Sequence, residues 1–221
     1  AITAEAERRG VTDCYPAAAN LTTRGGLGLE GTVDGRQMTI GSHRLFEEEH
    51  DIPQKVEEWV AKAESEGKTA MLLCDGQRVR GFIAVADTPR QDSQNVVADL
   101  NRMGKYTVML TGDNGTVAEV VGKEVGLDDV RSGLLPGDKQ QAIAKLRDQF
   151  GTVAMVGDGI NDAPALASAD LGIAMGGGGS AQAMETADIV LMADDINKLP
   201  FAIRLSQFAN RLIRQNIIFS L

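Results

Sequence analysis

Short apolar runs alternate with helical patterns through the second half of this sequence, and that rhythm restricts the possible folds more than any other feature. The apolar runs cover residues 107–110, 153–156, 171–175 and 189–192, and the helical patterns cover 93–103, 115–125 and 138–150. Strands that alternate with helices build βαβ units with a parallel sheet. Strands that are apolar throughout fit a sheet covered on both faces. The sequence therefore predicts an α/β domain with a doubly wound parallel sheet.

The first part of the chain shows a different pattern. Asp34-Gly35 and Asp75-Gly76 each separate two strand-like runs, and such pairs are strong signals of β-hairpins. A helical stretch at 54–66 lies between the two hairpins. After residue 197 the pattern is that of one long helix, which carries three arginines before an apolar end. The predicted regions are an α+β domain with an antiparallel sheet at 1–83, the α/β domain at 84–197 and a helix at 198–221.

Composition and chain ends limit the class of protein. The net charge of −9 argues against nucleic acid as a partner, because binding to a phosphate backbone needs a basic surface. No run of about 20 apolar residues occurs, so the sequence contains no complete membrane span. The chain begins at Ala1 without Met and ends within the apolar run Ile217–Leu221. From these ends we expect a fragment of a longer protein.

One loop carries the most specific chemical signal in the sequence. It is the run Gly157-Asp158-Gly159-Ile160-Asn161-Asp162, which directly follows the apolar run ending at Val156. The glycines allow a tight turn, Asp158 and Asp162 are suited to hold one Mg²⁺ ion, and Asn161 can fix the geometry without adding charge. Mg²⁺ prefers one or two carboxylates together with phosphate oxygens. An Asx-rich turn without a ligand is the alternative, and the loop favours a Mg²⁺-dependent phosphoryl-transfer site.

Two further polar groups accompany this loop. Thr111-Gly112-Asp113 comes directly after the strand-like run 107–110, where a hydroxyl and a backbone N–H group can bind phosphate oxygens. Lys139 follows Pro136-Gly137-Asp138 at a helix start and can neutralise charge on a transferring phosphoryl group. Each has an ordinary alternative, a turn after a strand for the first and a solvated lysine for the second. Because ligands bind at the carboxyl ends of strands in α/β sheets, we expect all three groups to share one edge.

The acceptor group for the phosphoryl is the missing part. The only strand-like run that ends in Asp before Thr111 is Ala84–Asp87. Thr88-Pro89-Arg90 follows it, and Pro89 favours a linker or hinge over the turn that a nucleophile needs. We therefore expect the nucleophile to lie upstream of Ala1.

These motifs, in this order, resemble those of P-type ATPases, and the resemblance is closest to the heavy-metal-transporting branch and covers nearly the whole chain. Four short motifs carry it: a hinge motif, a Thr-Gly-Asp motif, a Pro-x-x-Lys motif and a Mg²⁺ loop. In this sequence they are Asp87-Thr88-Pro89-Arg90, Thr111-Gly112-Asp113-Asn114, Pro136-Gly137-Asp138-Lys139 and Gly157–Pro164. The resemblance implies a haloacid-dehalogenase-like phosphorylation domain, and it places Asp87 and Arg90 among the nucleotide-binding residues.

The first domain resembles the nucleotide-binding domain of metal pumps. Gly26-Leu27-Gly28 leads into the Asp34-Gly35 hairpin, and its glycines are expected to let adenosine approach the backbone. Ile40-Gly41-Ser42 resembles that domain's second nucleotide contact, which is usually Gly-Asn, so Ser42 stands where the family has Asn. A simple hairpin entry is the alternative for the Gly-x-Gly pattern. The resemblance implies ATP contacts at Gly26, Gly28, Gly41 and Ser42.

The resemblance implies an ATP-driven membrane transporter of which this chain is a cytoplasmic part. A family member transfers phosphate from ATP to an Asp, hydrolyses the aspartyl phosphate and couples this cycle to export of a heavy-metal cation. The phosphorylated Asp-Lys-Thr-Gly-Thr motif and a His-Pro pair are expected before Ala1. The helix at 198–221 is expected to begin a transmembrane helix, with a plain amphipathic helix as the alternative. Arg214-Gln215-Asn216-Ile217 resembles the membrane entry of zinc, cadmium, lead or cobalt pumps more than that of copper pumps.

Two other functions stay open at this point. A soluble phosphatase of the haloacid dehalogenase superfamily shares the sheet and the Mg²⁺ loop, but it carries Asp-x-Asp near its N-terminus and a different cap domain. A non-catalytic nucleotide-binding module would bind ATP analogues through Gly26 and Gly28 without any need for Asp158. The upstream sequence separates the first alternative from a transporter, and nucleotide titration separates the second.

Overall fold

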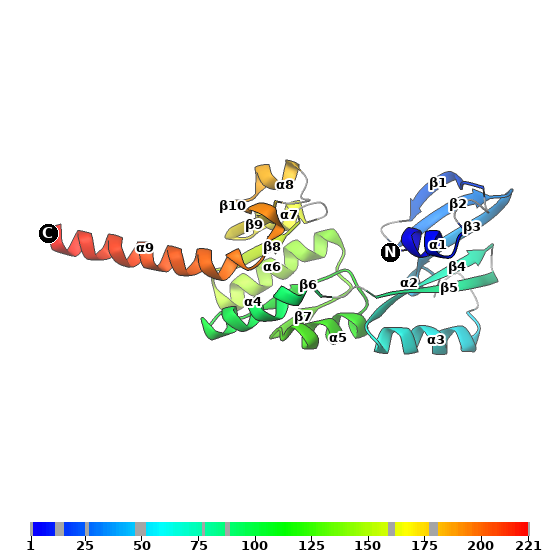
Figure 1. The fold of residues 1–221 in the computed structure, drawn as a ribbon, viewed down its shortest axis with the longest axis horizontal. Coiled ribbons are helices and arrows are strands. Elements are labelled where there is room, and N and C mark those ends of the chain that lie inside the picture. Colours follow the sequence, from blue (N-terminus) through cyan, green and yellow to red (C-terminus); the bar gives the residue numbers. More distant parts are fainter. Residues whose placement is uncertain are drawn as a thin grey trace. The chain divides into compact units, whose positions relative to one another are not determined.

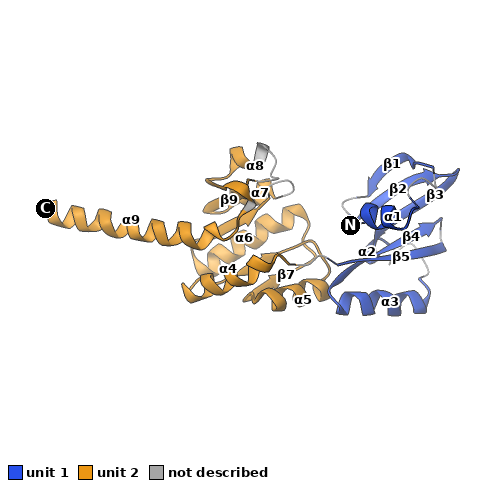
Figure 2. Ribbon diagram, in the orientation of Figure 1, with its two compact units in different colours: residues 1–88 blue, residues 89–221 orange. Residues whose placement is uncertain are grey.

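The protein divides into two compact units, residues 1–88 and 89–221 (Figure 2). The structure is a computed structural model, and it describes residues 2–11, 16–24, 27–46, 52–76, 78–86, 89–158, 162–176 and 181–220. Each unit has its own apolar core and is considered by itself. The boundary expected between residues 83 and 84 falls within strand β5 (Arg78–Ala86), which belongs to unit 1.

Unit 1 is built on an antiparallel sheet (Figure 1). Its described strands follow one another in the order β1-β2-β3-β4-β5. They are β1 (Ala19–Arg24), β2 (Gly28–Val33), β3 (Arg36–Ser42), β4 (Lys68–Asp75) and β5 (Arg78–Ala86). The turn between β2 and β3 has a left-handed backbone at Asp34 (φ 50°) and Gly35 (φ 73°), as a two-residue type I′ hairpin requires. Both predicted hairpins are therefore present.

The described helices of unit 1 are α1 (Ile2–Arg8), α2 (His43–Phe46) and α3 (Gln54–Ser65). Helices α2 and α3 pack against one face of this sheet. Alternate residues of β4 are buried, and they pack with Phe46 of α2 and Val60 of α3 in one apolar cluster. The buried members of that cluster are Phe46, Val60, Ala70, Leu72 and Cys74. The buried alternate residues of β4 and the apolar residues at helical spacing in α3 thus pack in the same core.

Unit 2 contains parallel strands in two separate pieces. One piece pairs β6 (Val108–Leu110) with β7 (Asp129–Arg131), and the other has the strand order β10-β9-β8. The strands of the second piece are β8 (Ala154–Gly157), β9 (Leu171–Met175) and β10 (Ile189–Leu191). Every described pairing in this unit is parallel, which confirms the predicted parallel sheet. In the described part of the chain, no backbone pairing joins β6 to β8.

The α-helices described in unit 2 are α4 (Gln91–Arg102), α5 (Gly115–Val125), α6 (Pro136–Phe150), α7 (Ala163–Ser168), α8 (Ala181–Thr186) and α9 (Lys198–Ser220). Two of them, α5 and α6, start at residues that are typical of helix N-termini. The Asn114 side chain accepts the Thr116 N–H ahead of α5, and left-handed Gly126 (φ 85°) ends that helix. Pro136 is the first residue of α6. A backbone N–H at this position has no hydrogen-bond partner within the helix, so its absence in proline does no harm.

Two apolar clusters hold unit 2 together. The first joins Ile143 of α6 to Met155 of β8 and Leu166 of α7, and Leu110 of β6 packs against it. The second joins Ile173, Leu191 and Leu199. Full burial of a large aliphatic side chain contributes roughly 1.5–3 kcal/mol. The first cluster therefore fixes α6 firmly to β8.

The last helix, α9, leaves the body of unit 2 after its first turns (Figure 1). Leu199 and Pro200 are buried, and the Arg204 guanidinium lies 3.8 Å from the Asp99 carboxylate of α4. All residues from 204 to 220 are exposed. Within the described ranges, none of the helices combines the length and the apolar character of a membrane span.

Candidate phosphoryl-transfer site

Main-chain hydrogen bonds fix the turn that follows β6. The Thr111 N–H donates to the Arg131 carbonyl at 3.0 Å, and the Leu134 N–H donates to the Thr111 carbonyl at 3.0 Å. The Gly133 N–H donates to the Asp113 carbonyl at 2.8 Å. The position of the turn is therefore set by the segment that leads from β7 into α6.

The side chains of this turn bond to each other. The Thr111 hydroxyl donates to Asp113 Oδ2 at 2.8 Å, and the Asp113 N–H donates to the same hydroxyl oxygen at 3.1 Å. A Cβ atom on Gly112 would lie 3.2 Å from the Leu134 carbonyl oxygen, so this position favours glycine. Because its hydroxyl proton is already shared with a carboxylate, Thr111 can bind a phosphate oxygen only in competition with Asp113.

Lys139 lies at the start of α6 and forms a close ion pair. The Asp138 carboxylate caps the helix by accepting the Leu135 N–H at 3.0 Å. The Lys139 Nζ donates to Asp162 Oδ1 at 2.6 Å, and the two side chains are only 15% and 18% exposed. Hydrogen bonds between ionised groups are about twice as strong as neutral ones. The pair thus joins the predicted phosphate-contacting lysine to one of the two predicted metal ligands.

Asp158 and Asp162 lie on either side of the loop that follows β8. Asp158 comes directly after the strand and is exposed, and Asp162 directly precedes α7. A Cβ atom on Gly157 would lie 3.4 Å from Asp162 Oδ2, so the Asp162 carboxylate lies against the end of the strand. Gln140 Nε2 donates to the Pro164 carbonyl at 3.1 Å and ties α6 to the same segment. Nothing in the sequence pattern singled out Gln140 apart from its place beside Lys139.

These acidic groups fit a Mg²⁺ ion that is only partly coordinated by protein. Among the residues that the structure describes, no three or more His, Cys, Asp or Glu side chains gather as a metal site. Mg²⁺ usually takes one or two carboxylates and completes its shell with water and phosphate oxygens. Asp158 and Asp162 supply the two carboxylates that such a site uses, and Lys139 already pairs with Asp162.

In unit 1, the predicted nucleotide contacts Gly28 and Gly41 lie opposite each other on β2 and β3. A Cβ atom on Gly28 would lie 2.5 Å from the Ile40 carbonyl oxygen and 2.7 Å from Leu45 Cδ2. A Cβ atom on Gly41 would lie 2.5 Å from the same Leu45 atom. Neither position can hold a larger residue unless its surroundings move. Close contacts with the Ile40 and Leu27 carbonyls and with Leu45 therefore explain both glycines without a ligand.

Ser42 shows a feature that packing does not explain. Its N–H donates to the Leu27 carbonyl at 2.9 Å, but its buried hydroxyl has no hydrogen-bond partner among the described residues. Leaving a buried polar group unpaired costs about 1–3 kcal/mol, so such groups are usually satisfied by water or a ligand. The Ser42 hydroxyl is thus the side-chain group of unit 1 that best fits a ligand contact.

The predicted site residues are only partly brought together. The structure joins two pairs, Thr111 with Asp113 and Lys139 with Asp162. Arg90 directly precedes α4. Three predicted residues lie outside the described ranges, namely Gly26, Asp87 and Asn161.

Comparisons with known proteins identify the family of this chain. The family of haloacid dehalogenase-like hydrolases matches residues 2–170. A probable cadmium-transporting ATPase of Staphylococcus aureus is 46% identical over 224 residues, which cover 100% of this chain and 28% of that protein. A copper-exporting P-type ATPase of Staphylococcus haemolyticus is 42% identical over 201 residues, 91% of this chain and 25% of that protein. The crystal structure of a zinc-transporting PIB-type ATPase in the E2.Pi state is 38% identical with a TM-score of 0.65, covering 98% of this chain and 34% of that one.

The chain belongs to the haloacid dehalogenase-like hydrolases. Within that family it is similar along its whole length to heavy-metal-transporting P-type ATPases, and this confirms the resemblance that the four sequence motifs predicted. The chain spans about a third or less of the length of these relatives. Their described cargoes are cadmium, zinc and copper, so similarity alone does not select the ion.

Proposed function

We propose that this chain is the catalytic part of an ATP-driven heavy-metal cation transporter, and that it helps to form and hydrolyse an aspartyl phosphate. The observation that carries the proposal is the Lys139–Asp162 ion pair beside Asp158 at the end of β8. A lysine and two carboxylates at a strand end are the groups that phosphoryl transfer uses to bind a metal ion and to neutralise charge.

The gap in strand pairing supports an acceptor carboxylate on another segment. Leu110 of β6 packs against the cluster that contains Met155 of β8, so the two strands border one core, yet no described backbone pairing joins them. Unpaired strand edges are places where a further strand can add. We infer that a strand outside this sequence pairs there and carries the Asp that accepts the phosphoryl group. Its carboxyl end would then lie between the ends of β6 and β8, which lead into Thr111 and Asp158.

Each site residue then has a chemical task. The Gly112 N–H binds one oxygen of the phosphoryl group, and the Thr111 hydroxyl donates to another in place of its 2.8 Å bond to Asp113. Lys139 neutralises charge on the same oxygens. Asp158, assisted by Asp162 and Asn161, is proposed to hold Mg²⁺. When bound, Mg²⁺ supplies further positive charge to the phosphoryl oxygens.

Unit 1 is proposed to bind the nucleoside part of ATP. Gly28 and Gly41 form a flat cross-strand pair, and the unpaired Ser42 hydroxyl lies directly after it. Gly26 is proposed to complete this contact. Asp87 and Arg90, in the segment between the units, are proposed to act with the nucleotide as the family's hinge motif does.

The C-terminal helix is proposed to lead into a membrane, which would make this chain a cytoplasmic part of a membrane protein. Arg211 and Arg214 precede the exposed apolar side chains of Ile217, Ile218 and Phe219. Basic residues ahead of an apolar run are typical of the cytoplasmic edge of a membrane helix. The sequence from Arg214 to Ile217 favours zinc, cadmium, lead or cobalt as the transported ion over copper.

The test is phosphorylation of the full-length protein by radiolabelled ATP. We expect a Mg²⁺-dependent phosphoprotein that hydroxylamine cleaves, as it cleaves acyl phosphates, with turnover stimulated by Zn²⁺ or Cd²⁺. Stimulation by Cu⁺ alone would contradict the proposed ion. Absence of any phosphoprotein would contradict the proposed reaction.

A further inference from the structure

Lys139 and the Thr111 turn have to act on the same phosphoryl group, yet they belong to different parts of unit 2. The turn follows β6 and is bonded to the end of β7, whereas Lys139 is paired with Asp162 after β8. No described backbone pairing joins β6 to β8, and helix α6 is one element that connects the two sheet pieces.

On the β8 side, α6 is tightly held. Ile143 packs in the cluster with Met155, and Gln140 Nε2 bonds to the Pro164 carbonyl at 3.1 Å. Arg147 Nη2 donates to the Ser168 carbonyl at 2.6 Å. Apolar packing and polar contacts thus fix α6 along most of its length to the segment that contains Asp162.

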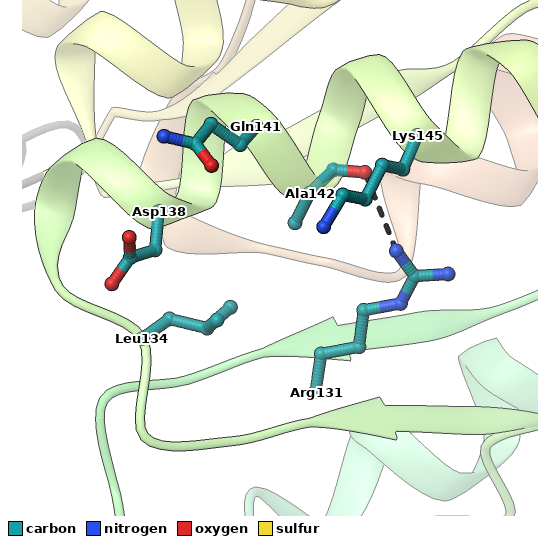
Figure 3. Close-up of a pocket in the computed structure, with 6 residues that line it drawn as sticks. All are labelled: Arg131, Leu134, Asp138, Gln141, Ala142 and Lys145. Carbon is teal, nitrogen blue, oxygen red and sulfur yellow. Dashed lines mark hydrogen bonds between the residues drawn. The ribbon is translucent and has the colours of Figure 1, made fainter.

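On the β7 side, the same helix borders a cavity of about 240 Å³ (Figure 3). Its lining residues are Arg131, Leu134, Asp138, Gln141, Ala142 and Lys145. The cavity is open to solvent and lies beside the first half of α6, the half that carries Lys139. The helix needs some other link to β7 at this level.

Arg131 provides that link. Its Nη1 donates to the Ala142 carbonyl at 3.5 Å, across the cavity and one turn after Lys139 (Figure 3). Its Nη2 donates to Gln149 Oε1 at 3.2 Å. Its Nε donates to Asp129 Oδ2 at 3.3 Å, which orients the guanidinium, and the side chain is only 23% exposed. Each contact is long, but one rigid fork makes all three.

The main chain of Arg131 completes the connection. Its carbonyl accepts the Thr111 N–H at 3.0 Å, so a single residue contacts the Thr111 turn with its backbone and α6 with its side chain. We propose that Arg131 is a positioning residue that sets the place of Lys139 relative to the Thr111 turn. The proposal rests on the proposed phosphoryl transfer for its effect on turnover, but the contacts that it invokes can be tested without turnover.

The experiment compares Arg131→Gln with Lys145→Gln in the full-length protein. Both remove one positive charge from the same cavity, but Lys145 forms no hydrogen bond or ion pair among the described residues. A displacement of about 1 Å can cost up to about 100-fold in rate, so we expect kcat to fall about tenfold in Arg131→Gln with KM for ATP within about twofold. Arg131→Lys should recover part of kcat, since an ammonium can reach one acceptor but not all three. Lys145→Gln should match the wild type.

Amide hydrogen exchange gives a second readout that needs no ATP hydrolysis. Local opening should speed exchange at residues 136–142 about fivefold in Arg131→Gln but not in Lys145→Gln. If the two variants behave alike in kcat and in exchange, Arg131 has no positioning role. A parallel loss of kcat and of thermal stability, without rescue by Arg131→Lys, would also overturn the proposal. If the wild type hydrolyses no ATP but Arg131→Gln still exchanges faster than Lys145→Gln, the proposed function is contradicted and the Arg131 contact itself is confirmed.

Discussion

The two units present their candidate ligand residues in different ways. In unit 1 the glycine pair Gly28–Gly41 is already required by close contacts with neighbouring backbone carbonyls and Leu45. In unit 2 the candidate side chains bond to one another, and the Lys139–Asp162 pair is mostly withdrawn from water. Burying an ion pair costs desolvation energy that well-packed apolar residues would not cost. Packing alone therefore accounts for the glycines of unit 1 but not for the charges of unit 2, where the structure points more strongly to chemistry.

The largest expected effect tests that conclusion at Asp158. Replacing Asp158 with Asn removes the negative charge that a Mg²⁺ ion needs but keeps the size of the side chain. Loss of such an electrostatic group typically lowers turnover by about 100- to 1,000-fold. We expect Asp158→Asn in the full-length protein to lose phosphoprotein formation and its response to Mg²⁺ concentration.

Asp148→Asn is the matched control for this change, because Asp148 is an exposed residue near the end of α6. It should phosphorylate as the wild type does. Normal phosphorylation of Asp158→Asn would contradict the assignment of Asp158 as a Mg²⁺ ligand. It would also weaken the conclusion that unit 2 points more strongly to chemistry than unit 1.

The next effect decides whether Asp162 acts on the metal or on Lys139. We expect Lys139→Met and Asp162→Asn each to lower turnover about 100-fold, since each removes a charge next to the transferring group. If Asp162 acts through its 2.6 Å bond to Lys139, the double variant should be no slower than Lys139→Met, and Mn²⁺ binding followed by electron paramagnetic resonance should stay near normal. Additive losses with weakened Mn²⁺ binding would instead make Asp162 a metal ligand.

Sequence patterns predicted many elements of both units, because local physics determines them, but they did not indicate β1, β7 or α7. The Asp34-Gly35 turn, the helical spacing in α3 and the apolar runs of β8 and β9 all form as predicted. The predicted sheet of unit 2 differs in one respect, since β6–β7 and β8–β9–β10 are separate pieces among the described residues. Strand pairing is a long-range property that apolar runs do not encode.

The site could be predicted only as a set of residue types. The motifs indicated Thr111, Lys139 and Asp158, but which side chains pair with which depends on loop paths between distant elements. The bonds of Lys139 to Asp162 and of Thr111 to Asp113 are of this kind. The packing of Leu45 on the glycines is also of this kind. It gives a structural reason for glycines that motif reasoning assigned to a ligand.

A smaller effect tests that packing explanation in unit 1. In Gly28→Ala the new methyl group would meet the Ile40 carbonyl at 2.5 Å and Leu45 Cδ2 at 2.7 Å. Overpacking of this kind costs about 1–3 kcal/mol, and we expect urea unfolding of unit 1 to shift accordingly. Gly81→Ala is the control, because nothing lies within 4 Å of a Cβ there, and it should change stability by less than about 0.5 kcal/mol. A stable Gly28→Ala that no longer binds ATP would favour the ligand explanation instead.

The smallest expected effect is the pH dependence of thermal stability that one exposed carboxylate causes in each unit. The Val153 N–H at 2.9 Å, and then the Arg147 guanidinium at 3.0 Å, lower the pKa of Asp170 in unit 2. Arg8 on the same short helix, and then Arg9 just after it, lower the pKa of Glu5 in unit 1 to about 2. A carboxyl group with a lower pKa in the folded state adds stability above its unfolded pKa of about 4, and that stability is lost as the pH falls through the folded pKa.

Thermal unfolding of Asp170→Asn and Glu5→Gln at pH 7 and pH 3 measures this difference. Asp170 joins α6 to the start of β8 through contacts distant in sequence, so Asp170→Asn should lower Tm at pH 7 by a few degrees at most, and less at pH 3. Glu5 contacts only its own helix and its near neighbour Arg9, so Glu5→Gln should change Tm by about a degree or less at either pH. The change in Tm caused by each substitution should be smaller in 1 M salt, because exposed charges are screened. An equal response of the two variants would mean that the long-range carboxylate in unit 2 stabilises the fold no more than a local helix pair does in unit 1.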